Sequence, residues 1–225
     1  MILTPIEPHR LPAILDAFAH GLRGHGALAE AAFARIVAAP RRSLTPAEEE
    51  RARGKAVALA HRFGIATLDE EPARAFSWDG AVIRSRSEPS VLLHEIAHWR
   101  ICPPARRALP DFGLGAGPES GRKAAADAAR ATDPACQERE EAMASVLGIL
   151  WEAELDFPAL AAFAEQNWLE AYDRPGTPAY FATVVGWLWE AALIDDRARP
   201  RGPEAVAPEA IAGSSFVASK IATGF

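Results

Sequence analysis

The sequence predicts a mainly helical α+β protein with a pair of central helices and a small antiparallel β-ribbon. Apolar residues recur with the helical period of about 3.6 over several stretches of the 225-residue chain. One apolar stretch carries His94 and His98 one helical turn apart, and a glutamate-rich helical stretch follows after residue 136. Asp79-Gly80 lies between two short apolar runs, which is a strong signal for a β-hairpin.

Composition limits the class of protein. With 49% hydrophobic and 24% charged residues, the chain matches an ordinary globular protein that can bury a sizeable core. The 24 basic and 30 acidic residues give a net charge of −6, which argues against a nucleic-acid binder. The chain has no apolar run of membrane-spanning length and no secretory signal, so we expect no membrane partner and a cytoplasmic location. Cys102 and Cys136 are expected to be reduced thiols.

Periodicity and stop signals define the N-terminal elements. Helices are expected over about 10–22, 27–39 and 45–63. Pro40 stops the second of these helices. Thr45-Pro46-Ala47-Glu48 is a capping box with proline at the first helical position, so it opens the third helix.

The predicted ribbon spans residues 75–84 around the Asp79-Gly80 turn. Ser87 or Ser90 is the expected N-cap of the next helix, which ends before Pro103. After a loop-rich connection, further helices are expected over about 122–130, 138–156, 159–171 and 178–194. The last two are rich in aromatic residues, which favours a role in the core.

The stretch from His94 to His98 has the pattern H-E-x-x-H. Positions i and i+4 of a helix lie on one face, so the two imidazoles would point at a common point. Glu95 would lie close enough to take a proton from a water molecule bound there. The spacing therefore predicts a two-histidine metal site with Glu95 as its catalytic carboxylate. The alternative is a buried helix whose two histidines make ordinary hydrogen bonds.

Two histidines hold a divalent ion poorly, so a third protein ligand is expected. Because no histidine follows His98, the helix over 138–156 is the simplest source, through Glu138, Glu140 or Glu141. Glu140 lies on an apolar stripe, whereas Glu141 shares a line with Ser145 and Gly148, and these small residues allow another helix to approach. The pattern favours Glu141 and leaves Glu138 as the second choice. Alternatively, all three carboxylates are merely favoured by the dipole at the helix N-terminus.

A His-His-Glu site supports two chemistries. With zinc, a bound water is acidified, Glu95 takes its proton and the hydroxide attacks a peptide carbonyl. With ferrous iron, the open positions would take dioxygen and substrate, as in an oxygenase. Hydrolysis would need an added electrophilic group, and the tyrosines, Tyr172 and Tyr180, have no marked context. A third possibility is a scaffold with a structural metal, or a binding module.

A family resemblance bears on this choice. His94 to Trp99, then Ala105-Arg106-Arg107, then Asp111-Phe112-Gly113, resembles the bacterial elongation factor P hydroxylase family, which has a similar H-E-x-x-H-W stretch, paired arginine and Asp-Phe-Gly step. A later helix of that family carries two glutamates three residues apart, and Glu138 and Glu141 match them. The resemblance implies Glu141 as the metal ligand, Fe(II) rather than Zn(II), and oxygen-dependent hydroxylation of a modified lysine on a translation factor.

The sequence also predicts how the chain is divided and what it does. We expect a zincin-like pair of helices in one metal-binding catalytic domain over residues 1–195, with extra N-terminal helices at about 10–63. Residues 196–225 are rich in proline, glycine and alanine and are predicted to form a C-terminal strap. Arg106 and Arg107 are expected to close the end of the metal helix, with Asp111 anchoring one of them. The predicted activity is metal-dependent hydroxylation of a protein substrate; the alternative is a zinc metallopeptidase-like hydrolase.

Overall fold

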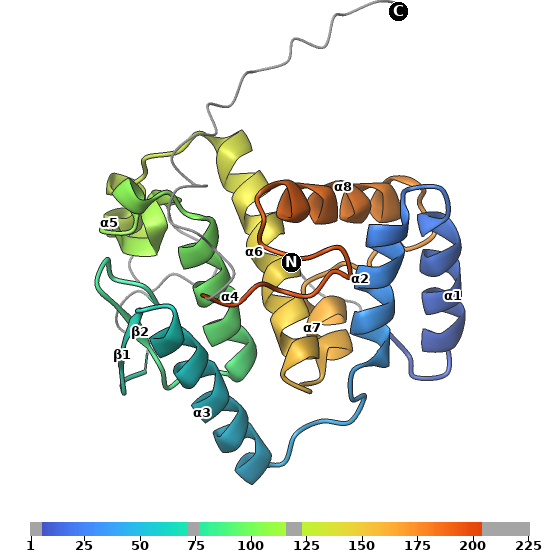
Figure 1. The fold of residues 1–225 in the computed structure, drawn as a ribbon, viewed down its shortest axis with the longest axis horizontal. Helices are drawn as coiled ribbons and strands as arrows, with labels where there is room; N and C mark the ends of the chain where they lie inside the picture. Colours follow the sequence, from blue (N-terminus) through green and yellow to red (C-terminus); the bar gives the residue numbers. More distant parts are fainter. Residues whose placement is uncertain (1–5, 72–76, 116–122, 204–225) are drawn as a thin grey trace, which may run out of the picture.

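The computed structural model describes residues 6–71, 77–115 and 123–203 (Figure 1). Its α-helices are α1 (Leu11–Leu22), α2 (Ala27–Ala38), α3 (Pro46–Arg62), α4 (Pro89–Ile101), α5 (Lys123–Ala128), α6 (Pro134–Glu154), α7 (Ala159–Glu165) and α8 (Gly176–Glu190). Two 3-10 turns, η2 (Pro104–Arg106) and η3 (Pro110–Gly113), follow α4. The strands are β1 (Ala66–Leu68) and β2 (Val82–Arg84). The prediction of a mainly helical α+β protein is confirmed.

The small sheet corrects the predicted antiparallel ribbon. β1 and β2 pair in parallel, with Thr67 opposite Ile83. The Asp79-Gly80 turn does reverse the chain, because Trp78 and Ile83 form an isolated antiparallel bridge. In the part of this region that the structure describes, that contact does not extend into a ladder; residues 72–76 lie outside it.

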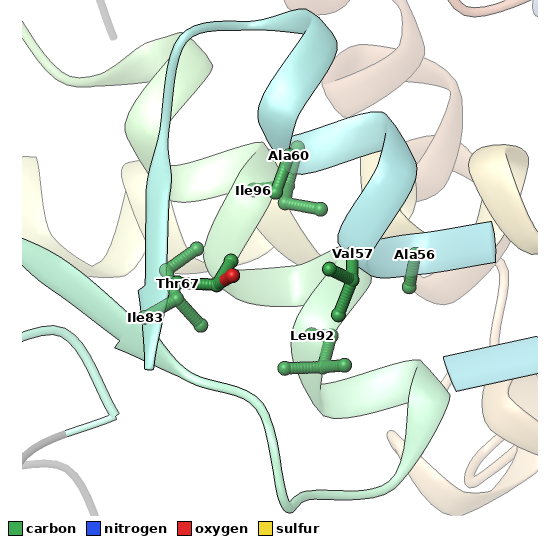
Figure 2. Close-up of a pocket in the computed structure, with 7 residues that line it drawn as sticks. All are labelled: Ala56, Val57, Ala60, Thr67, Ile83, Leu92 and Ile96. Atoms are coloured by element: carbon green, nitrogen blue, oxygen red, sulfur yellow. The ribbon is translucent and has the colours of Figure 1, made fainter. Parts of the chain in front are cut away.

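The parallel pairing follows from the way α3 ends. Gly64 has a φ of 74°, and its N–H donates to the carbonyl of His61 at 2.9 Å. The N–H of Ile65 returns to the carbonyl of Ala60 at 3.0 Å, which completes a Schellman motif. The chain thereby turns back beside α3 and reaches β2. Figure 2 shows the apolar junction that results between the strands, α3 and α4, lined by Ala56, Val57, Ala60, Thr67, Ile83, Leu92 and Ile96.

Most predicted helices are confirmed, with changes at their ends. The capping box of α3 forms as expected, with Thr45 and Glu48 exchanging hydrogen bonds. The N-cap of α4 is Glu88 rather than a serine, because Pro89 occupies the first helical position. α6 begins at Pro134, about one turn earlier than predicted, and α7 ends earlier than predicted, at Glu165.

α4 and α6 lie side by side at the centre of the molecule (Figure 1). They run in opposite directions, since His98 contacts Glu141 whereas His94 lies against Gly148. A Cβ built on Gly148 would lie 3.3 Å from the Cα of His94, so the glycine lets the two helices approach closely. Gly148, on the line of small residues predicted on α6, therefore meets the histidine helix, whereas Ser145 on the same line accepts a hydrogen bond from Trp168.

The other face of α6 belongs to a second group of helices, α1, α2, α7 and α8 (Figure 1). Their aromatic rings form a continuous buried cluster that contains Phe18, Phe33, Phe163 and Phe181. α7 and α8 thus contribute rings to the core, as predicted from their aromatic content, although the side chains of Tyr180 and Trp189 are exposed.

The start of the predicted strap packs on the protein. Ile194 and Pro200 form an antiparallel bridge, and Ala198 between them is fully buried. Residues 204–225 lie outside the described chain. Within the described ranges, no helix combines the length and apolarity needed to cross a membrane.

Candidate metal centre

His94 and His98 from α4 and Glu141 from α6 converge on one point. The Nε2 atoms of the two histidines lie 3.0 Å apart. Oε2 of Glu141 lies 3.3 Å from Nε2 of His98 and 3.6 Å from Nε2 of His94. One possible ligand atom from each residue thus lies within 4.8 Å of the others, and no other such group of three occurs in the part of the chain that the structure describes. The structure brings together the three residues that the sequence analysis favoured as ligands.

These spacings fit a single divalent ion. Nitrogen and oxygen ligands lie about 2.0–2.2 Å from zinc, so pairs of ligands at angles of about 90–109° lie about 2.8–3.6 Å apart. The three observed separations of 3.0, 3.3 and 3.6 Å fall in that range. Two imidazoles and one carboxylate suit zinc as well as non-haem iron. The donor set therefore fits a metal without selecting one.

The other two candidate glutamates have different surroundings. Glu140 is buried and pairs with Arg106, and Glu138 is exposed to solvent. Neither belongs to the converging group. Because α6 begins at Pro134, the three glutamates lie beyond its first turn, which removes the main reason for expecting them as dipole-favoured carboxylates.

The cluster is open on one side. The side chain of His98 is 5% exposed, whereas those of His94 and Glu141 are 27% and 42% exposed. Burial and the neighbouring His94 lower the pKa of His98. Burial also acts to lower the pKa of His94, but the contact with Glu141 outweighs it and raises that pKa. Hydrogen bonds from both histidines hold the pKa of Glu141 well below its usual range, although burial opposes them.

A stack of aromatic rings forms the wall behind His98. Phe112 stacks on the imidazole with ring centroids 5.5 Å apart, and Trp78 stacks on Phe112 at 5.3 Å. The segment from Asp111 to Gly113 is left-handed throughout, with φ values of 43°, 54° and 68°. For non-glycine residues this conformation costs about 1–3 kcal/mol each, and such strain persists where the surroundings enforce it. Here the left-handed turn carries the Phe112 ring to the histidine.

Glu95 follows His94 on α4, and the charges of His94 and Glu141 act on its carboxyl group. Burial raises the pKa of its carboxyl to about 7; the charges of Asp111 and Glu141 act in the same direction. His94 and a hydrogen bond from Ser77 act in the opposite direction. The carboxyl group can thus exchange a proton near neutral pH, which suits a general acid or base.

The paired arginines have the structural role that the sequence predicts. Arg106 pairs with Glu140, and it donates to the carbonyl of Phe112 at 2.7 Å. Arg107 lies over the ring of Trp99, 3.8 Å from its centroid. It also donates to the carbonyl of Cys102 at the end of α4.

Sequence reasoning gave no site role to Trp78 and Ser77. Phe112 was predicted only as part of the Asp-Phe-Gly step, and no contact was predicted for its ring. Cys102 and Cys136 are free thiols, as expected, and burial raises the pKa of Cys102 to about 12.

No protein-family model, curated protein or solved structure matches this chain. The resemblance to the elongation factor P hydroxylase family therefore stays a prediction.

Proposed function

We propose that this protein is a metal-dependent enzyme, with His94, His98 and Glu141 holding ferrous iron, and that it hydroxylates a side chain of a protein substrate. The convergence of these donors from two helices, with Glu95 beside them, carries the proposal. Structural zinc sites close the ion within four protein ligands. In the described chain only three such donors converge, and the exposure of His94 and Glu141 leaves room for a substrate.

Each residue has a distinct part in this proposal. The two imidazoles and Glu141 bind the ion, and the rings of Phe112 and Trp78 exclude water from the side of His98. Ferrous iron held by two histidines and one carboxylate supplies oxygen chemistry when it is bound. Glu95, held by its hydrogen bond from Ser77, accepts or returns a proton beside the ligands.

A translation factor that carries a modified lysine is the proposed substrate. This choice rests on the family resemblance in the stretches from His94 to Trp99 and from Asp111 to Gly113. The cytoplasmic location proposed above agrees with such a partner.

The alternative is a zinc metallopeptidase-like hydrolase. The position of Glu95 favours it, because a carboxylate next to the first histidine of H-E-x-x-H is where the general base of such an enzyme lies. In that case Glu95 would take the proton of the attacking water.

Metal analysis after anaerobic purification is the test. Stoichiometric iron, together with oxygen uptake that depends on the translation factor, would support the hydroxylase. Zinc, together with casein cleavage in the absence of oxygen, would support the peptidase. Failure to bind either ion would refute both.

A further inference from the structure

His98 has a ring nitrogen whose hydrogen bond is unaccounted for. Its Nε2 faces Glu141 at 3.3 Å, while its Nδ1 is buried and has no hydrogen-bond partner among the described residues. If Nε2 presents its lone pair to a metal, as the proposed function requires, then Nδ1 carries the proton. A buried N–H group without an acceptor is unfavourable, so we expect a group of the protein to accept a hydrogen bond from this nitrogen.

Glu140 carries a buried hydrogen-bond acceptor that lacks a donor among the described residues. It is 5% exposed, its Oε2 pairs with Arg106, and its Oε1 is buried without a hydrogen-bond partner in the part of the chain that the structure describes. Glu140 is the neighbour of Glu141 on α6, and Oε2 of Glu141 lies 3.3 Å from Nε2 of His98. A buried acceptor and a buried donor thus belong to residues on two helices that are in contact at this position.

Arg106 connects both groups. One of its nitrogens contacts Glu140, and another donates to the carbonyl of Phe112, whose ring stacks on His98. If the role of Glu140 were only to neutralise Arg106, one carboxylate oxygen would suffice, and burial of the second without a partner would stay unexplained.

We infer that Glu140 is a positioning residue, whose Oε1 accepts the Nδ1–H of His98 and so fixes the tautomer that presents Nε2 to the metal. A side-chain rotation or one bridging water closes the contact. Arg106 holds the carboxylate in place through their ion pair. The inference rests on the proposed metal-binding role of His98 and adds a hydrogen-bond acceptor for that ligand. Removal of such outer partners typically weakens metal binding by about 10–100-fold.

The test measures the affinity of the full chain for Co(II) and Zn(II) by competition with a chromophoric chelator. Glu140→Leu should weaken binding by about 10–100-fold. Glu140→Gln, which keeps an oxygen acceptor, should recover much of the affinity. Because Glu140→Leu leaves Arg106 buried without its partner, the double variant Glu140→Leu/Arg106→Met keeps the test valid should the single variant unfold. The matched control is Glu154→Leu, which breaks the ion pair of α6 with Arg35 away from the site and should leave the affinity unchanged.

A second measurement separates positioning from general destabilisation. In the Zn(II)-loaded chain with ¹⁵N-labelled histidine, His98 should show a protected Nδ1–H proton that exchanges faster with water in the double variant.

Unchanged affinity and unchanged exchange in the double variant would overturn the role of Glu140 while leaving the proposed function intact. If the unaltered chain binds neither metal, the proposed function fails, and this inference fails with it.

Discussion

Gly148 of α6 lies against the backbone of His94 of α4, so that a Cβ on the glycine would be 3.3 Å from both the nitrogen and the Cα of His94. This contact sets the distance between two helices that each supply part of the candidate metal centre. His94 comes from one of them and Glu141 from the other. The geometry of the ligands thus depends on a position that has no side chain.

Gly148→Ala should weaken metal binding without a gain in stability. Replacing a helical glycine by alanine normally stabilises by about 0.5–1 kcal/mol. At Gly148, that gain would be offset because the new methyl group pushes α4 away. Gly186→Ala in α8, where a Cβ would meet nothing within 4 Å, should show the full gain and unchanged metal affinity. Urea unfolding and chelator competition measure both quantities, and equal metal affinities for the two variants would contradict this account.

Loss of a ligand should remove the metal but leave the fold intact. His98→Ala and Glu141→Ala each delete one of the three donors and should abolish stoichiometric metal. Glu138→Ala is the control, since that exposed glutamate lies three residues from Glu141 on the same helix. Metal analysis and far-UV circular dichroism provide the readouts. Metal retained in Glu141→Ala and lost in Glu138→Ala would move the ligand to Glu138.

Glu95→Gln should retain the metal and lose activity. The amide has nearly the same size as the carboxyl and can still accept a hydrogen bond from Ser77, but it cannot transfer a proton. Loss of general acid–base catalysis typically lowers the rate by about 100- to 10,000-fold. Turnover and metal content should be measured on the same preparation. Full turnover with bound metal would show that Glu95 takes no part in catalysis.

Glu152 should make the protein less stable as the pH rises. Burial raises the pKa of this carboxyl from 4.5 to about 8, with a smaller contribution from Glu165. Between these two values the unfolded chain has released the proton while the folded chain keeps it, so rising pH favours unfolding. The free energy of unfolding should fall by up to about 1.4 kcal/mol per pH unit over this window and level off above it.

Glu152→Gln should remove this contribution, and the variant should gain stability over the unaltered protein between pH 5 and pH 8. Glu190→Gln, at an exposed position of α8, is the control. Urea unfolding at a series of pH values gives the difference between each variant and the unaltered protein. A difference for Glu152→Gln that does not change with pH would contradict the buried neutral carboxyl.

The sequence predicted the parts of the site that depend on local spacing. His94 and His98 share a face because both lie on one helix, and the small residue at Gly148 marked the face of α6 that meets them. The charge of Glu140 on an apolar stripe indicated a buried group. Its partner, Arg106, comes from 34 residues earlier in the chain, and local patterns do not specify such a pairing.

The predicted strand pairing was wrong for a related reason. The Asp79-Gly80 turn reverses the chain as its sequence predicts, but the partner of β2 comes from the segment after α3. That choice depends on how α3 packs against α4. The left-handed turn at Phe112 was also missed, because a bulky residue rarely adopts a positive φ and no local signal marks it.

Phe112 should matter to metal binding beyond its part in the core. Its ring is 1% exposed between His98 and Trp78, so Phe112→Ala opens a cavity and should cost about 3–5 kcal/mol of stability. Phe163→Ala, at a fully buried position in the other half of the protein, should have a similar cost. Metal affinity should fall in the first variant alone, because only there does the imidazole of His98 lose the surface that fixes its orientation. Chelator competition on both variants, at a temperature where unfolding curves show each to be folded, makes the comparison. Equal affinities would mean that α4 alone orients the histidine and that the aromatic wall serves only packing.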